Sequence, residues 1–161
     1  MKNNQKYDTQ EDLVVVVDET DKVIDYLPRK EAHKKNLTHR TTAILVFNSE
    51  GKLLLQKRAK NKDTYPGFYA LSAGGHVLKG QSYKKGAERE LYEELMIFGK
   101  LEYINTFLVP DNIHMTMTAA FKMISNGPFE FNTYEIEKVE FFEIEKIKEI
   151  KENLTPQAKI I

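Results

Sequence analysis

The sequence predicts one mixed α+β domain in which helices pack on a β-sheet. Short runs rich in β-branched and aromatic residues recur between turn residues, which is typical of strands. One amphipathic helix, expected at 82–96, interrupts them. The 161 residues contain no repeat, low-complexity tract or linker, and this length is enough for one domain with its own core. We therefore expect a flexible polar N-terminus at 1–11 and a single domain at 12–161.

The individual elements follow from local patterns along the chain. A valine-rich run and a short apolar return flank the turn at 18–21, which predicts a hairpin, and Pro28 then suits the first turn of a short helix. Glycines and a Pro-Gly pair predict loops over 59–69 and around Gly74-Gly75. We expect strands at 13–17, 23–27, 41–47, 52–58, 101–109, 114–123 and 139–144, and helices after Pro28, over 82–96 and over 145–153.

Composition narrows the class of protein. The 24 basic residues equal the 24 acidic ones, so nothing points to a nucleic acid or a membrane surface as partner. The absence of cysteine excludes a disulfide framework, a thiolate zinc site and a cysteine nucleophile, and it fits a reducing cytoplasm. No apolar run reaches the length of a membrane span, and the first six residues lack the apolar stretch of a signal peptide. We expect a soluble, cytoplasmic protein.

The helix expected at 82–96 carries an unusual set of acids. Two of them, Glu90 and Glu94, fall inside or beside its apolar stripe, where an ionised carboxylate is costly unless it is paired. Arg89 meets Glu93 at i+4 and can offset one charge. A hard divalent cation with oxygen ligands would neutralise the rest. The stripe itself follows i, i+4 spacing and consists of Tyr83, Ala87, Leu91 and Leu95.

Two other features bear on this interpretation. The acids could instead pair with basic residues from elsewhere, such as Lys57 or Arg58. Upstream, Gly74-Gly75 allows the backbone to approach a ligand closely, and a carbonyl there can complete the coordination of a metal ion. Metal held by a few carboxylates and by substrate phosphates is the usual arrangement for phosphate chemistry.

The segment 75–97 resembles the Nudix box, which runs Gly, five residues, Glu, seven residues, Arg-Glu, an aliphatic, any residue, Glu-Glu, any residue, Gly and an aliphatic. The strand residues Leu53 to Arg58 and the Pro66-Gly67-Phe68 loop also resemble that family, so the likeness covers residues 38–150. Seven of the nine defined positions match, namely Gly75, Arg89, Glu90, Leu91, Glu93, Glu94 and Ile97.

The resemblance implies an α/β/α sandwich around a mixed sheet, with the box as a loop-helix-loop motif. It also implies a pyrophosphohydrolase that uses Mg²⁺, or Mn²⁺ in its place, to cleave a phosphoanhydride bond in a nucleoside diphosphate linked to another moiety. The expected partner is therefore a small-molecule diphosphate. The implied catalytic residues are Arg89, Glu90, Glu93, Glu94 and Glu135, and the implied metal ligands are Gly75, Glu90, Glu93 and Glu94.

Two positions depart from the box. Gln81 replaces a glutamate, which removes an ionic partner for Arg89 and predicts weaker support of the metal site. Met96 replaces a glycine that suits a left-handed cap, so we expect the helix to continue and to end near Gly99.

Two alternative functions stay open. The N-terminal part and Gly75-His76 resemble isopentenyl-diphosphate isomerase, a Nudix-fold enzyme whose metal is held mainly by histidines, and His39 and His76 fall near two of those ligand positions. However, Gly74 stands where the isomerase has its cysteine. The segment that corresponds to the isomerase's glutamate region is 112–114 in this chain. The second alternative is a weakly catalytic nucleotide-binding or diphosphate-binding module, which only Gln81 favours.

The histidines have more ordinary interpretations when each is taken alone. His33 is expected on the surface of a short helix, and His39 and His76 are expected to form hydrogen bonds more often than to bind metal. His114 receives no role.

Substrate contacts and oligomeric state are less defined by the sequence. The basic residues of 57–62 can meet phosphates, and Tyr65, Phe68 or Tyr69 can stack on a base, although solubility and core packing are the commoner roles of such residues. The strand at 13–17 either pairs in a homodimer or completes the domain's own sheet.

Overall fold

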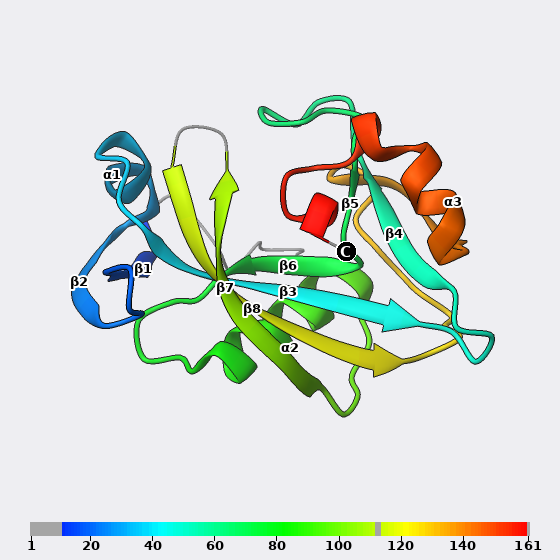
Figure 1. Ribbon diagram of the computed structural model, residues 1–161, viewed down its shortest axis with the longest axis horizontal. Helices are drawn as coiled ribbons and strands as arrows, with labels where there is room; N and C mark the ends of the chain where they lie inside the picture. Colours follow the sequence, from blue (N-terminus) through cyan, green and yellow to red (C-terminus); the bar gives the residue numbers. More distant parts are fainter. Residues whose placement is uncertain (1–10, 112–113, 161) are drawn as a thin grey trace, which may run out of the picture.

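The computed structural model describes residues 11–111 and 114–160, so the expected flexible N-terminus lies almost wholly outside the described residues. The described chain is a curved sheet with helices around it (Figure 1). Within this described part, every helix is too short or too polar to cross a bilayer. The elements are β1 (Leu13–Val17), β2 (Val23–Pro28), α1 (Arg29–Lys34), β3 (His39–Phe47), β4 (Leu53–Arg58), β5 (Tyr69–Ala70), β6 (Ala73–His76), α2 (Tyr83–Leu95), β7 (Glu102–Asp111), β8 (His114–Ile124), β9 (Ile136–Phe142), α3 (Ile144–Glu149) and two short 3₁₀ helices, Lys151–Asn153 and Ala158–Ile160.

One sheet contains all nine described strands, and β3 is its centre. β3 pairs antiparallel with β1, β4 and β6 and parallel with β8, so the sheet is mixed. β7 continues the sheet beyond β8, and β9 pairs with β4. Because successive side chains of a strand point to opposite faces, β3 supplies two different cores.

The two faces of the sheet are covered by different helices. Ile44 and Val46 of β3 pack with the buried residues of α2, whereas the neighbouring Ala43 packs with Ile147 of α3. The apolar stripe of α2 is confirmed, since Ala87, Leu91 and Leu95 are all buried. The predicted α+β class and the α/β/α sandwich of the Nudix type are therefore confirmed.

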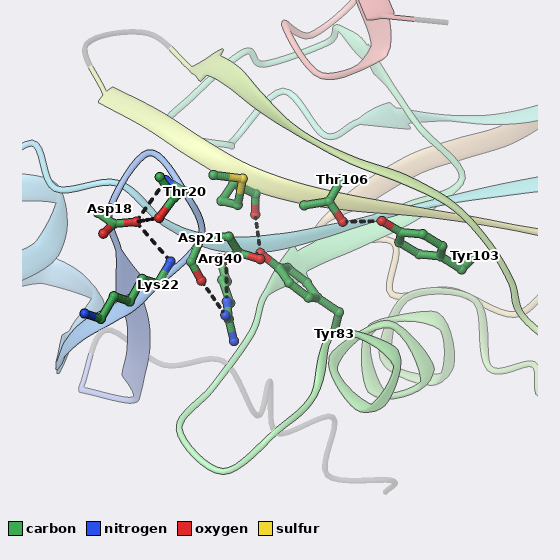
Figure 2. Close-up of polar contacts among 9 residues, drawn as sticks. Asp18, Thr20, Asp21, Lys22, Arg40, Tyr83, Tyr103 and Thr106 are labelled. Carbon is green, nitrogen blue, oxygen red and sulfur yellow. Dashed lines mark hydrogen bonds and ion pairs between the residues drawn. The ribbon is translucent and has the colours of Figure 1, made fainter.

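The N-terminal hairpin completes this sheet from within the chain. Val14 to Val17 are buried, and β1 pairs with both β2 and β3, which is the second of the two roles considered for this strand. The turn of the hairpin is fastened to α2 through Asp21, whose Oδ1 accepts hydrogen bonds from Arg40 Nε at 2.8 Å and from Tyr83 Oη at 2.9 Å (Figure 2). Burial and the bond to Asp21 raise the pKa of Tyr83, so it remains a neutral donor.

Three expectations from the sequence are wrong in detail. The last strand ends at Phe142, because Ile144 already begins α3. Helix α2 ends at Leu95, since Met96 itself takes the left-handed conformation (φ 53°) and its N–H bonds to Tyr92 O, so the helix does not continue to Gly99. The Gly74-Gly75 pair is not in a loop but in β6, opposite Ala43 and Thr42.

Candidate active site

Helix α2 packs on the sheet and holds the predicted acids in a defined orientation. Ser82 caps its N-terminus by accepting a hydrogen bond from Lys85 N, and the buried stripe sets its rotation. Glu90 consequently lies on the packed side with 3% of its surface exposed, as the helical geometry predicts. Lys85 and Tyr92, on the other side of the helix, are exposed.

Both glycines of β6 stand where a side chain would collide with a neighbour. A Cβ on Gly75 would overlap the carboxylate of Glu90, and a Cβ on Gly74 would stand 2.5 Å from the Thr42 carbonyl oxygen. Gly74 N donates to Glu94 Oε2 at 3.0 Å. Strand β6 therefore lies directly against both acids, and we call Gly75, Glu90 and Glu94 the carboxylate site.

The acids differ in their partners. Glu94 Oε2 also accepts from Gln56 Nε2 at 3.0 Å. The guanidinium of Arg89 contacts Glu93 at 3.1 Å, as the i+4 spacing predicts, and also contacts Glu90 Oε1 at 2.9 Å. Arg89 additionally donates to the His76 carbonyl at 2.7 Å, which ties the helix to the end of β6. Arg89 and Glu93 thus form a cross-link beneath the carboxylate site.

A cavity of about 710 Å³ opens in front of the carboxylate site. Gly75, Glu90 and Glu94 form part of its wall, and Glu135 forms another part. Glu135 immediately precedes β9, its backbone carbonyl accepts from Ala59 N, and its carboxylate lies 3.5 Å from Lys62 Nζ. Glu93 lies instead on a separate shallow surface beside Tyr92. The structure therefore brings four predicted site residues to one cavity and leaves Glu93 with Arg89 behind it.

Basic and aromatic residues also line the cavity. Arg58 lines it and donates to the Thr64 carbonyl at 3.0 Å. Burial lowers the pKa of Arg58, and the negative charge of Glu94 acts in the opposite direction. Lys57 pairs with Glu137 at 3.3 Å. The alternative in which distant basic residues neutralise the helix acids therefore does not hold for Lys57, whereas the charges of Arg58 and Glu94 do act on one another.

The aromatic candidates divide in the same way. Tyr65 lines the cavity and contacts Phe68 edge-on, with ring centroids 5.7 Å apart. Tyr69 packs edge-on against Phe142 in the core, which is the ordinary role considered for it. Tyr134, which the sequence did not single out, is mostly exposed at the rim.

Gln81, which replaces the glutamate of the box, contacts the backbone just before α2. Its side-chain carbonyl accepts a hydrogen bond from Leu78 N at 3.1 Å, so it closes the turn that precedes α2. Arg89 has partners in Glu90, Glu93 and the His76 carbonyl. The weaker support of the metal site that Gln81 predicts stays a prediction.

The four histidines form a cluster that sequence reasoning missed. Rings of His33, His39, His76 and His114 lie with centroids 4.6 to 5.4 Å apart in five pairs. His39 is fully buried, and burial together with the neighbouring His76 lowers its pKa to about 3, so it is neutral. The other three line the cavity that the carboxylate site faces. The interpretation of His33 as an isolated surface residue is thus wrong, because α1 packs over the ends of the strands. We call these four residues the histidine cluster.

The sequence also matches known proteins. The model of the NUDIX domain family matches residues 37–161. A Nudix hydrolase of Pseudomonas aeruginosa, PA4841, is 37% identical over 131 residues, which cover 81% of this chain and 78% of the relative. The Nudix hydrolase YfcD of Escherichia coli is 32% identical over 146 residues, covering 90% and 81% of the two chains.

Solved structures share the fold at lower identity. The crystal structure of DR0079 from Deinococcus radiodurans superposes with a TM-score of 0.75 at 21% identity, over 89% of this chain and 91% of that one. The NUDIX domain of NrtR from Shewanella oneidensis, solved with ADP ribose, gives a TM-score of 0.61 at 16% identity, over 73% and 79%. These likenesses concern the fold.

Proposed function

The chain belongs to the NUDIX family and is a Nudix hydrolase, and we propose that it uses a divalent metal ion to cleave a phosphoanhydride bond in a nucleoside diphosphate linked to another moiety. One observation carries this proposal. The Glu90 carboxylate fills the space that a side chain at position 75 would need, and it faces a cavity that also holds Glu94, Glu135 and Arg58. Anionic and cationic groups therefore line the same space, which is of ligand size.

The donor atoms of the carboxylate site fit Mg²⁺. That ion prefers oxygen ligands, usually one or two carboxylates together with water and substrate phosphates. Glu90 and Glu94 would supply the carboxylates and Gly75 the carbonyl, with Mn²⁺ as the alternative ion. When bound, the ion would offset negative charge on the phosphate oxygens. Glu93, also implied as a ligand by the family, is held by Arg89 and would support the site from behind.

The remaining groups have roles in positioning and proton transfer. Arg58 and Lys62 would bind phosphate oxygens, since a guanidinium presents paired donors and an ammonium presents a point charge. Glu135 would take the proton of the attacking water, because it faces the same cavity as the ligand carboxylates. Its contact with Lys62, at 3.5 Å, would hold the carboxylate in place. Tyr65 would form the wall against the leaving moiety.

The experiment is a panel of nucleoside diphosphate derivatives with Mg²⁺, including ADP-ribose and Ap4A, the compounds named with two of the similar folds. We expect phosphate-containing products from at least one member. Glu94→Gln should lower kcat/KM at least about 100-fold, because losing even an outer-shell partner of a metal ligand costs 10- to 100-fold. Glu88 lies on the same helix and pairs with Lys85 at 3.1 Å, so Glu88→Gln is the matched control and should leave the rate unchanged.

Other outcomes would favour the alternatives. Ligand binding without turnover would support the diphosphate-binding module, and exchange of carbon-bound hydrogen without phosphate release would support the isomerase. The geometry of Gly74 opposes the isomerase, since a cysteine side chain there would meet the Thr42 carbonyl. The absence of cysteine is compatible with a reducing cytoplasm, where we propose that the enzyme acts.

A further inference from the structure

The four residues of the histidine cluster are all the histidines in the chain, and four separate elements supply them. His33 comes from α1, His39 begins β3, His76 ends β6 and His114 begins β8. Their sequence separation is large, so their meeting depends on the tertiary fold. All four nevertheless lie in one place in the described chain.

The strand register explains how they meet. His39 stands opposite Thr116 on β8, and Thr41, two residues along β3, stands opposite His76 on β6. Residues two apart on a strand share a face, so His114, two before Thr116, lies on the same face as His39. Three imidazoles therefore project from one face of three adjacent strands, and α1 lays His33 over them.

The most buried member has a nitrogen that the protein leaves unused. His39 Nδ1 lies 2.8 Å from the Leu37 carbonyl and must donate its proton there, which leaves Nε2 with its lone pair. His39 is 0% exposed, and among the described residues none forms a hydrogen bond with that Nε2. Leaving a buried acceptor without a donor is unfavourable, and a bound cation would use this lone pair.

The spacing of the ring nitrogens suits a shared ion. Nitrogen ligands lie about 2.1 Å from zinc, so two of them on one tetrahedral ion are ~3.4 Å apart. His33 Nε2 and His76 Nε2 are 3.3 Å apart. Ligand atoms of His33, His39 and His114 all lie within 4.8 Å of one another, so rotation of these side chains toward a shared ion would complete the set.

A cluster of hydrogen-bonded histidines is the ordinary alternative. It accounts for the pair His33 and His76, where one nitrogen can donate to the other. It does not account for His39 Nε2, and His114 Nε2 is 3.7 Å from its carboxylate neighbour Asp111, beyond hydrogen-bonding distance.

We propose that the histidine cluster binds a divalent transition-metal ion of the zinc class, in a closed site with four nitrogen ligands. Neutral imidazole suits Zn²⁺, Co²⁺ or Ni²⁺, whereas Mg²⁺ selects oxygen. Four protein ligands fill a tetrahedral ion, so this ion holds α1, β3, β6 and β8 together and leaves no position for substrate. The proposal does not depend on the hydrolase activity, because none of its ligands belongs to the carboxylate site.

The test uses the full chain purified without a histidine tag and stripped of metal. Because the chain has four histidines, an imidazole nitrogen NMR spectrum of the ¹⁵N-labelled protein reports only on the cluster. We expect one equivalent of Zn²⁺ to shift all four imidazoles together, and the same amount of Mg²⁺ to shift none. Signals that ignore Zn²⁺, or that respond equally to Mg²⁺, would overturn the proposal.

Variants locate the ion independently of activity. His33→Ala should weaken Zn²⁺ binding in calorimetry by at least roughly tenfold, since it removes a direct ligand and even outer-shell losses reach that size. Lys34→Ala, its exposed neighbour on α1, is the matched control and should bind as the wild type does. Glu90→Gln should also retain Zn²⁺. Loss of Zn²⁺ binding in Glu90→Gln with retention in His33→Ala would place the ion at the carboxylates and refute the proposal.

The closed coordination has a spectroscopic test. Co²⁺ in the cluster should give the intense visible bands of a tetrahedral complex, and added inorganic pyrophosphate should leave them unchanged. Bands that shift with pyrophosphate would show an open coordination position and would contradict a closed site.

Discussion

The carboxylate site and the histidine cluster border one cavity but differ in how their buried polar atoms are satisfied. Glu94 receives hydrogen bonds from Gly74 N and Gln56, and Glu90 has Arg89 beside it, so the fold already offsets much of their charge. His39 carries no charge, yet its Nε2 has no hydrogen-bond donor within the described chain. The two sites thus offer different ligands, hard anionic oxygens in one and softer neutral nitrogens in the other. The oxygens would select Mg²⁺ and the nitrogens an ion of the zinc class.

The largest expected effect comes from a substitution that would disturb the carboxylate site. Gly75→Ala places a methyl group where the Glu90 carboxylate lies, so β6 or α2 must move. We expect a loss of about 1–3 kcal/mol in the free energy of unfolding, which is typical of overpacking, measured by urea denaturation. Hydrolysis should fall roughly 100-fold, since a displacement of about 1 Å near reacting groups can cost that much.

A second substitution checks the cause of that loss. Gly75→Ala combined with Glu90→Ala removes the overlap and should regain most of the stability without regaining activity. If Gly75→Ala alone unfolds at the same urea concentration as the wild type, the close packing of β6 against Glu90 is not what stabilises this region.

An intermediate effect would sharpen the comparison by testing each cation on stability. Zn²⁺ at 100 times its Kd should raise the midpoint of thermal unfolding by about 5–10 °C, because binding to the native state alone adds about 2.7 kcal/mol. The increase should disappear in His33→Ala and persist in Glu94→Gln, as followed by calorimetry. An equal increase in both variants would mean that the two regions do not discriminate between ions.

The smallest effect is expected at Gln81. Gln81→Glu adds a negative charge near the helix and should raise Mg²⁺ affinity, but only about two- to threefold, as for partly exposed charges. The reason is that the side chain is already engaged with Leu78 N, a bond that a glutamate would also accept. Isothermal titration with Mg²⁺ measures the change, and a weaker affinity in the variant would contradict it.

The difference in sequence separation explains what could be predicted. The acids lie within two turns of one helix, so the i, i+4 stripe alone places Glu90 on the packed side, and the buried Glu90 confirms it. The α+β class, the hairpin at the N-terminus and most strands also follow from alternation and turn residues, whereas the sandwich followed from the family resemblance. Such features depend on neighbours along the chain.

The misses depend on distant partners instead. Gly74-Gly75 has the local pattern of a loop, but in the structure it pairs with β3 as a strand. Glycine is needed there because the Thr42 carbonyl and the Glu90 carboxylate occupy the space of a side chain. The histidines are separated by other elements, and their meeting requires the register of β3 with both β6 and β8. A histidine taken alone gives no signal of that register.

The four residues of β6 carry a further consequence for how the chain folds. Gly74 and Gly75 serve the carboxylate site while His76 serves the histidine cluster, and antiparallel pairing with β3 fixes all three. A slip of one residue would turn His76 toward Glu90 and remove an imidazole from the other face, since a single step reverses every side chain of a strand. Both sites would then be lost together. The ions proposed for them would therefore bind only the chain with the correct register, and their binding would stabilise that register over the shifted one.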